Sequence, residues 1–157
     1  MPKKAAPAPE LDQLPGFSIR RLQQIAVALF LQETEAHGIT PVQYAALQTV
    51  CLSPGIDQRT LAAAIGLDTS TTGGVIDRLE AKGVLRRSPS EHDRRVRLLT
   101  ATDEGQALAR RVAPAMLRAQ ERILAPLPAK ERREFLRMLR VLVEANNELS
   151  RAPSSAI

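Results

Sequence analysis

One stretch near the middle of the sequence describes two short helices joined by a tight turn, and this pattern restricts the fold more than any other feature. Asp57 can cap a helix over 58–65, and Gly66-Leu67 makes a turn before a second helix that runs to about Lys82. The first six positions of that second helix hold one Ser, three Thr and two Gly, all poor helix formers. Two short helices joined by a turn that contains Gly predict a helix-turn-helix unit.

The weak start of the second helix suits contact with DNA. Ser and Thr hydroxyls donate or accept at base edges in the major groove, and the Thr methyl can touch the thymine methyl. Arg78, about two turns further on, is placed for a phosphate or a guanine. Gly73 and Gly74 would allow close approach of a backbone, either of DNA or of a neighbouring helix. A capped surface helix that tolerates its glycines is an equally simple interpretation.

An arginine-rich hairpin follows the two helices and favours the DNA-binding interpretation. Strands are predicted at 84–87 and 96–100, with a polar loop between them. Residues 86–97 contain five Arg against two acids, so the loop tip can place Arg in a minor groove. Asp93 could hold a neighbouring Arg through a forked ion pair. Without the adjacent helices, a solvated run of charges would be the simpler interpretation.

Helical patterns flank this central unit on both sides. The spacing predicts helices from Pro15 to about His37, from Pro41 to about Leu52, from Thr102 to about Leu124 with a kink at Pro114, and over 129–149. The first and last of them carry apolar stripes, Ile19–Phe30 and Phe135–Val143.

Composition limits the class of protein. The 157 residues fit one domain, and the low aromatic content of 3% predicts an aliphatic core. The net charge of +5 favours a polyanionic partner. Only four of the 22 basic residues are Lys, and the rest are Arg. Either the recognition of phosphates and base edges or a bias in genome composition would explain this excess of Arg. Cys51 has no second cysteine to pair with, which predicts a reducing, cytoplasmic compartment. No apolar run predicts a membrane span or a signal peptide, so no membrane partner is expected.

Enzymatic function has little support in the sequence. The two histidines, His37 and His92, lie in unrelated segments, and no catalytic or metal-binding spacing is present. We therefore expect no catalytic residue, no metal and no cofactor.

The chain resembles the MarR family of bacterial transcription regulators from about Leu14 to Leu149. The resemblance rests on four segments: Ile39–Tyr44, Leu61–Gly83, the wing sequence Asp93–Thr100, and Thr102–Gly105 directly after it. It implies a mainly α fold with a small β-wing, a winged helix-turn-helix over 39–101, and interleaved dimerisation helices over 15–38 and 102–150. Residues 1–14 and 151–157 are expected to be flexible tails. In a homodimer the apolar stripes Ile19–Phe30 and Phe135–Val143 would pack between two chains. The alternative is that they only cover the winged domain of their own chain, without a homodimer.

The resemblance also implies roles for particular residues. Bases of a near-palindromic, double-stranded operator would be read by Thr69, Ser70, Thr71 and Thr72, with Arg78 nearby. Arg95, oriented by Asp93, would enter the minor groove, and Arg94 would share that role or contact a phosphate.

An effector is the last implied partner. Many members of the family release DNA when a small aromatic acid binds between the dimer helices and the winged domain. Arg20, Arg21, His37 and Tyr44 could supply a cation and hydrogen bonds to such a carboxylate, although solvated side chains are the simpler interpretation for each of them. The alternatives are a redox response at Cys51, whose apolar setting favours packing instead, and an architectural DNA binder without an effector.

Overall fold

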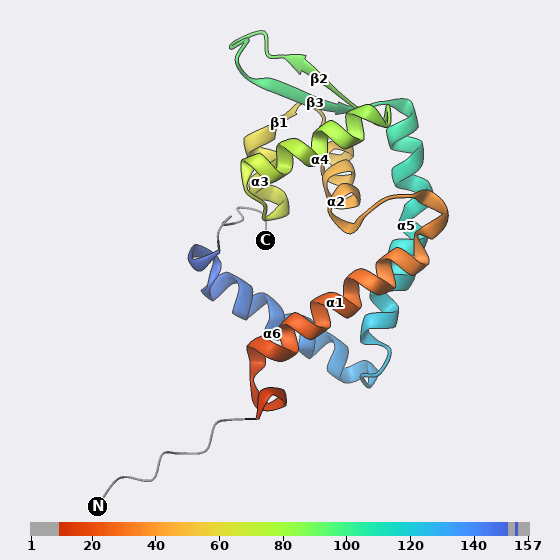
Figure 1. The fold of residues 1–157 in the computed structure, drawn as a ribbon, viewed down its shortest axis with the longest axis vertical. Helices are drawn as coiled ribbons and strands as arrows, with labels where there is room; N and C mark the ends of the chain where they lie inside the picture. The colour runs from red at the N-terminus through yellow and green to blue at the C-terminus, as the bar shows by residue number, and fades with distance from the viewer. Residues whose placement is uncertain (1–9, 151–152, 154–157) are drawn as a thin grey trace, which may run out of the picture.

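The computed structural model describes residues 10–150 and residue 153, and the fold is mainly helical with one small sheet (Figure 1). Most of the two expected tails therefore lies outside the described residues. The α-helices are α1 (Pro15–Glu33), α2 (Pro41–Leu52), α3 (Gln58–Ile65), α4 (Thr69–Ala81), α5 (Asp103–Leu124) and α6 (Ala129–Ala145). The strands are β1 (Ile56–Asp57), β2 (Leu85–Pro89) and β3 (Arg97–Ala101), and short 3₁₀ turns cover Leu11–Gln13, Glu35–His37 and Asn147–Leu149.

Side-chain caps set the starts of the central helices. Thr40 and Gln43 form a reciprocal capping box at the start of α2, with both hydrogen bonds at 3.3 Å. Asp57 caps α3 and Asp68 caps α4, each by accepting a hydrogen bond from the backbone N–H three residues later. These helices begin and end within a residue of the predicted positions because their caps and stops are local in sequence.

The first and last helices are shorter than predicted. Helix α1 ends at Glu33 instead of His37, because the buried Thr34 leaves helical geometry and its hydroxyl donates to the Phe30 carbonyl at 2.8 Å. A 3₁₀ turn then leads to Gly38, whose φ of 58° is in the left-handed region. Helix α6 likewise ends at Ala145, and a 3₁₀ turn occupies the last residues of the predicted helix.

The sheet has three antiparallel strands in the order β1-β3-β2. The predicted hairpin is present as β2 and β3, each shifted by about one residue from the predicted position. Pro89 ends β2, which is an edge strand, where a missing N–H costs little. Strand β1 was not predicted, because it contains only two residues and pairs with β3 about forty positions later.

The core is aliphatic and lies where α2, α3 and α4 meet the sheet and the first half of α5. Its largest completely buried hydrophobic side chains are Leu47, Val50, Leu61, Ile76, Leu79, Leu85, Leu99 and Val112. Helix α5 leaves the sheet at a close contact: a Cβ on Gly105 would lie 2.0 Å from the carbonyl oxygen of Val84. A side chain there would separate α5 from the winged unit.

Helix α1 packs along α5, and an ion-pair cluster joins the end of α1 to α5. Glu33 accepts from Arg118 at 3.0 Å and from Arg122 at 2.9 Å, and these two hydrogen bonds lower the pKa of its carboxyl group. Helix α6 lies at the end of the molecule opposite the wing (Figure 1) and contains no buried residue. Its half-exposed apolar side chains are Leu136, Met138, Val141, Leu142 and Val143.

Candidate nucleic-acid interface

The first turn of α4 presents short hydroxyl side chains to solvent. Thr69, Ser70 and Thr71 are exposed there. The carboxylate of Asp68 accepts from the backbone N–H of Thr71 at 2.8 Å and from its hydroxyl at 2.6 Å. These hydrogen bonds, first the one from the hydroxyl, lower the pKa of Asp68, so the cap stays ionised. The start of α4 is therefore held in a fixed shape.

Thr72 differs from the other three hydroxyl residues. Its side chain is completely buried, and its hydroxyl donates to the carbonyl oxygen of Asp68 at 2.9 Å. The expectation that Thr72 reads bases conflicts with this geometry, because the side chain faces the core together with Val75 and Ile76. Arg78, in contrast, is exposed on the outer side of α4.

The two glycines of α4 have different surroundings. A Cβ on Gly73 would lie 3.0 Å from the Nε2 atom of Gln58, which itself donates to the Thr69 carbonyl at 3.0 Å. A Cβ on Gly74 would meet nothing within 4 Å. Gly73 thus faces α3, and Gly74 faces open space.

The tip of the wing is shaped by Asp93. Its side chain accepts from the backbone N–H of Arg95 at 2.9 Å, and its carbonyl accepts from the N–H of Val96 at 2.9 Å. The expected forked ion pair between Asp93 and an arginine is absent from the described residues, because the carboxylate is used to close this turn. The side chains of Arg94 and Arg95 are exposed and have no partner within the described part of the chain.

Sequence reasoning missed an ion-pair cluster between the wing and α4. Arg87 on β2 reaches Asp77 at 2.6 Å through Nη2 and Glu80 at 2.6 Å through Nη1. Strand alternation carries the signal: Leu85 and Arg87 lie on the face of β2 toward α4, whereas Arg86 lies on the other.

The four expected effector residues are not brought together within one chain. Arg20 stacks over the ring of Phe17 at 5.3 Å, and Arg21 is exposed beside it. Both lie about 20 Å along α1 from its C-terminal end, given the rise of a helix. His37 is in the 3₁₀ turn beyond that end.

Tyr44 lines a groove next to the core. This groove of about 360 Å³ lies between α1, α2, α3 and α5 and is lined by Phe30, Pro41, Tyr44, Ala45, Gln48, Thr49, Ala64, Ile65, Met116 and Gln120. Tyr44 packs against Phe30 with ring centroids 6.0 Å apart. Burial raises the pKa of its hydroxyl, which therefore stays protonated as a hydrogen-bond donor.

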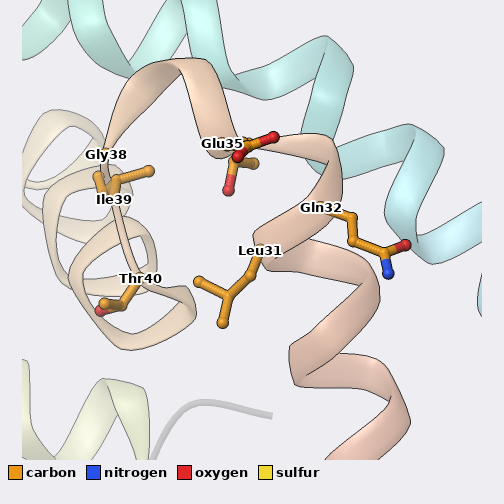
Figure 2. Close-up of a pocket in the computed structure, with 7 residues that line it drawn as sticks. Leu31, Gln32, Glu35, Gly38, Ile39 and Thr40 are labelled. Carbon is orange, nitrogen blue, oxygen red and sulfur yellow. The ribbon is translucent and has the colours of Figure 1, made fainter.

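A second groove, of about 440 Å³, lies at the junction of α1 and α2 (Figure 2). Leu31 projects into it from the last turn of α1, facing Ile39 and Thr40. Lys82, at the end of α4, donates to the carbonyl oxygen of Gly38 in the wall of this groove. The junction is thus joined directly to the end of α4.

The described residues offer little support for a reactive thiol, a metal site or a membrane-spanning helix. Cys51 is partly buried, and burial raises the pKa of its thiol, although nearby Arg110 opposes this in part. Within the residues that the structure describes, no group of acidic, His and Cys side chains could hold a metal ion. None of the described helices combines the length and the apolar character needed to cross a membrane.

Comparisons with known proteins agree with this geometry. A family model described as MarR family matches residues 37–96. The PcaV transcriptional regulator from Streptomyces coelicolor, solved with its natural ligand, is 36% identical with a TM-score of 0.80, and the match covers 89% of this chain and 99% of that one.

Two further regulators have been solved with DNA or studied with a ligand. A transcriptional repressor named CouR, solved on a 23-mer DNA duplex, is 28% identical with a TM-score of 0.81 over 89% of this chain and 99% of that one. CouR from Rhodococcus jostii, solved with p-coumaroyl-CoA, is 25% identical with a TM-score of 0.74 over 86% of this chain and 95% of that one. BpsR of Bordetella bronchiseptica, whose DNA binding is regulated through 6-hydroxynicotinic acid, is 27% identical with a TM-score of 0.82 over 87% of this chain and 97% of that one.

These relatives are transcription regulators, and no enzyme family is indicated. With the helix-turn-helix, the wing and the full-length likeness to PcaV in place, the chain belongs to the MarR family of DNA-binding transcription regulators.

Proposed function

We propose that this protein is a homodimeric repressor that a small aromatic carboxylate releases from a near-palindromic operator. The observation that carries the proposal is the exposed hydroxyl face of α4 beside a wing whose two tip arginines, Arg94 and Arg95, have no partner among the described residues. Unpaired guanidinium groups at a loop tip are available to phosphates and to a minor groove.

The reading of DNA is divided between α4 and the wing. Thr69, Ser70 and Thr71 meet base edges in the major groove, and Arg78 meets a guanine or a phosphate further along α4. Arg95 enters the adjacent minor groove, and Arg94 shares that role or contacts a phosphate. Asp93 acts indirectly, since it fixes the backbone of Arg95 through a hydrogen bond to its N–H.

The dimer is built by the segments 15–38 and 102–150. Helix α6 leaves apolar side chains half-exposed around much of its circumference, and Ile19 on α1, which lines one groove together with Leu136 of α6, is 55% exposed. Exposed apolar side chains gathered in this way indicate a surface that another chain covers. Two-fold symmetry then sets the two copies of α4 about 34 Å apart, which is one helical turn of DNA.

The effector site is the groove that Tyr44 lines. Its walls are apolar, with the polar groups of Gln48, Thr49 and Gln120 at its edge, so it suits an aromatic ring. No cation lines this groove within one chain, so we expect Arg20 or Arg21 of the second copy to meet the carboxylate. His37, in the 3₁₀ turn after α1, is the other proposed partner of the carboxylate. The 6-hydroxynicotinic acid that regulates DNA binding by BpsR supports this class of effector.

No observation favours a redox response, because burial disfavours the reactive thiolate form of Cys51. An architectural DNA binder remains a distinct candidate, and it differs in one respect. Benzoate, hydroxybenzoates or 6-hydroxynicotinate should remove the repressor from its operator, and none of them would affect an architectural protein.

The interface is tested by Arg95→Ala. We expect operator affinity to fall and the slope of log K against log salt to decrease by about one, because one phosphate or minor-groove contact is lost. Arg111→Ala is the matched control for charge, since Arg111 is an exposed arginine on α5, outside α4 and the wing. Because α5 belongs to the proposed dimer segments, the mass of this control variant in solution is measured beside that of the parent. Fluorescence anisotropy over a range of salt concentrations measures both the affinity and the slope. An unchanged slope for Arg95→Ala at unchanged affinity would show that the wing assignment is wrong.

A further inference from the structure

The guanidinium group of Arg87 joins the wing strand to α4 by two charged contacts. Nη2 lies 2.6 Å from the Asp77 carboxylate, and Nη1 lies 2.6 Å from that of Glu80. The backbone N–H of Arg87 donates to the other oxygen of Glu80 at 3.1 Å. Glu80 therefore holds both the backbone of β2 and the side chain of Arg87, and Asp77 holds that side chain from the preceding turn of α4.

One of the two carboxylates, that of Asp77, lies on the face of α4 that is proposed to approach DNA. Asp77 follows Ser70 by seven residues, or about two turns, and therefore shares its face. Its side chain is 67% exposed, whereas that of Arg87 is 23% exposed. The charge of Arg87 is thus directed into the protein, unlike that of the exposed Arg94 and Arg95.

We propose that Arg87 is a positioning residue, which sets the angle between the wing and α4 and contacts no phosphate itself. The inference rests on the proposed interface, in which α4 and the wing occupy adjacent grooves. Both elements must then fit one duplex at once, so a rotation between them removes contacts in one groove or the other.

Directional bonds at this position have a physical reason. The turn into β2 is also held by a hydrogen bond from the Val84 N–H to the Leu79 carbonyl at 3.1 Å. Along β2 itself the buried packing beside α4 is apolar, through Leu79 and Leu85, and apolar packing has no preferred direction. A forked, charge-assisted pair fixes distance and orientation together. An ordinary surface ion pair, in contrast, would contribute little to stability and nothing to DNA reading.

Arg87→Lys tests the forked geometry at constant charge. A lysine keeps the positive charge but cannot hold both carboxylates in the fixed fork of a guanidinium. We expect operator affinity to fall about tenfold, the scale of one lost base-pair contact, with an unchanged salt slope and an unchanged affinity for non-specific DNA. The matched control is Arg86→Lys on the same strand. Among the described residues Arg86 donates only to the Thr100 hydroxyl, at 3.0 Å, so affinity should remain near that of the parent.

Glu80→Ala distinguishes a net-charge effect from a positioning role, because the two predict opposite changes in the affinity for DNA. Removing a negative charge near DNA should strengthen binding if only net charge matters. The positioning role predicts weaker and less specific binding, because β2 loses its attachment to α4. Glu91→Ala removes the same charge from the wing loop, where Glu91 has no partner among the described residues, and should bind as well as the parent or better.

The outcomes separate this inference from the proposed function. If Arg87→Lys and Glu80→Ala bind the operator like the parent, or if Arg87→Lys lowers the salt slope, Arg87 is not a positioning residue. Arg95→Ala measured in the same series reports on the interface itself. If Arg95→Ala weakens operator binding but Arg87→Lys does not, only the positioning role of Arg87 is wrong. If Arg95→Ala binds the operator like the parent, the proposed DNA interface itself is wrong.

Discussion

At the scale of single residues, the outer face of α4 depends on a missing side chain. Gly74 lies one turn after Ser70 and one turn before Arg78, so the three share a face. Nothing lies within 4 Å of the position that a Cβ on Gly74 would occupy. Gly74 is therefore not needed for packing inside the protein. Since glycine destabilises the interior of a helix, its presence here needs another explanation.

Gly74→Ala should stabilise the protein and weaken its binding to DNA. Alanine is favoured over glycine inside a helix by about 0.5–1 kcal/mol, and there is open space for its methyl group. The same methyl group would stand between α4 and the bases, so operator affinity should fall by about tenfold. Urea unfolding and anisotropy measure the two effects.

Gly16→Ala in α1 is the control, since its Cβ also meets nothing within 4 Å and it lies outside the winged unit. It should not alter affinity. If Gly74→Ala binds the operator as tightly as the parent, α4 does not approach DNA along this face.

The sequence distinguishes the hydroxyl residues of α4 less well than the structure does. Thr71 and Thr72 look equivalent in a hydroxyl-rich stretch, but helical periodicity places Thr72 on the stripe of Val75, Ile76 and Leu79. That signal was available and would have excluded Thr72. The hydrogen-bond and ion-pair partners of Asp93 and Arg87 could not be predicted from the sequence, because they depend on the turn at the wing tip and on the contact between β2 and α4.

At the scale of elements, local signals decided which parts of the fold could be predicted. Helices α2, α3 and α4 were predicted closely because each has a capping residue and a stop beside it. Strand β1 was missed because its only support is a distant strand. The end of α1 was misplaced because a buried threonine, invisible as such in the sequence, ends it.

The cap of α3 leads to a prediction with a pH dependence. Hydrogen bonds from Thr60, first from its hydroxyl, hold the pKa of Asp57 below its ordinary 3.8, against an opposing effect of burial. Because the pKa is lower in the folded state, the ionised carboxylate adds to the free energy of unfolding. This contribution is fully present above about pH 3.8, the ordinary pKa, and is lost as the pH falls through the pKa of the folded protein. Asp57→Ala should therefore cost about 1 kcal/mol at neutral pH and progressively less in acid.

Urea unfolding at pH 7 and near pH 3 measures this difference. Asp12→Ala is the matched control, because Asp12 is an exposed carboxylate for which the structure gives no hydrogen bond among the described residues. A constant difference between Asp57→Ala and the parent at both pH values would mean that the ionised cap does not stabilise α3.

At the scale of the whole molecule, a single chain leaves two features incomplete. Several apolar side chains of α6 stay half-exposed to solvent among the described residues, and the four expected effector residues do not meet in the groove that Tyr44 lines. The sequence predicted the apolar stripe correctly but could not say whether the same chain or another chain covers it. The same limit applies to the effector residues, whose assembly depends on how two copies pair.

The mass of the protein in solution and on one operator duplex, measured by native mass spectrometry, tests the pairing most directly. We expect two chains in the free protein and two chains on each near-palindromic duplex. We also expect that Leu142→Asp, at a half-exposed position of α6, gives folded single chains with weakened operator binding. A parent protein that remains a single chain, free and on DNA, and prefers no duplex over bulk DNA would contradict the account.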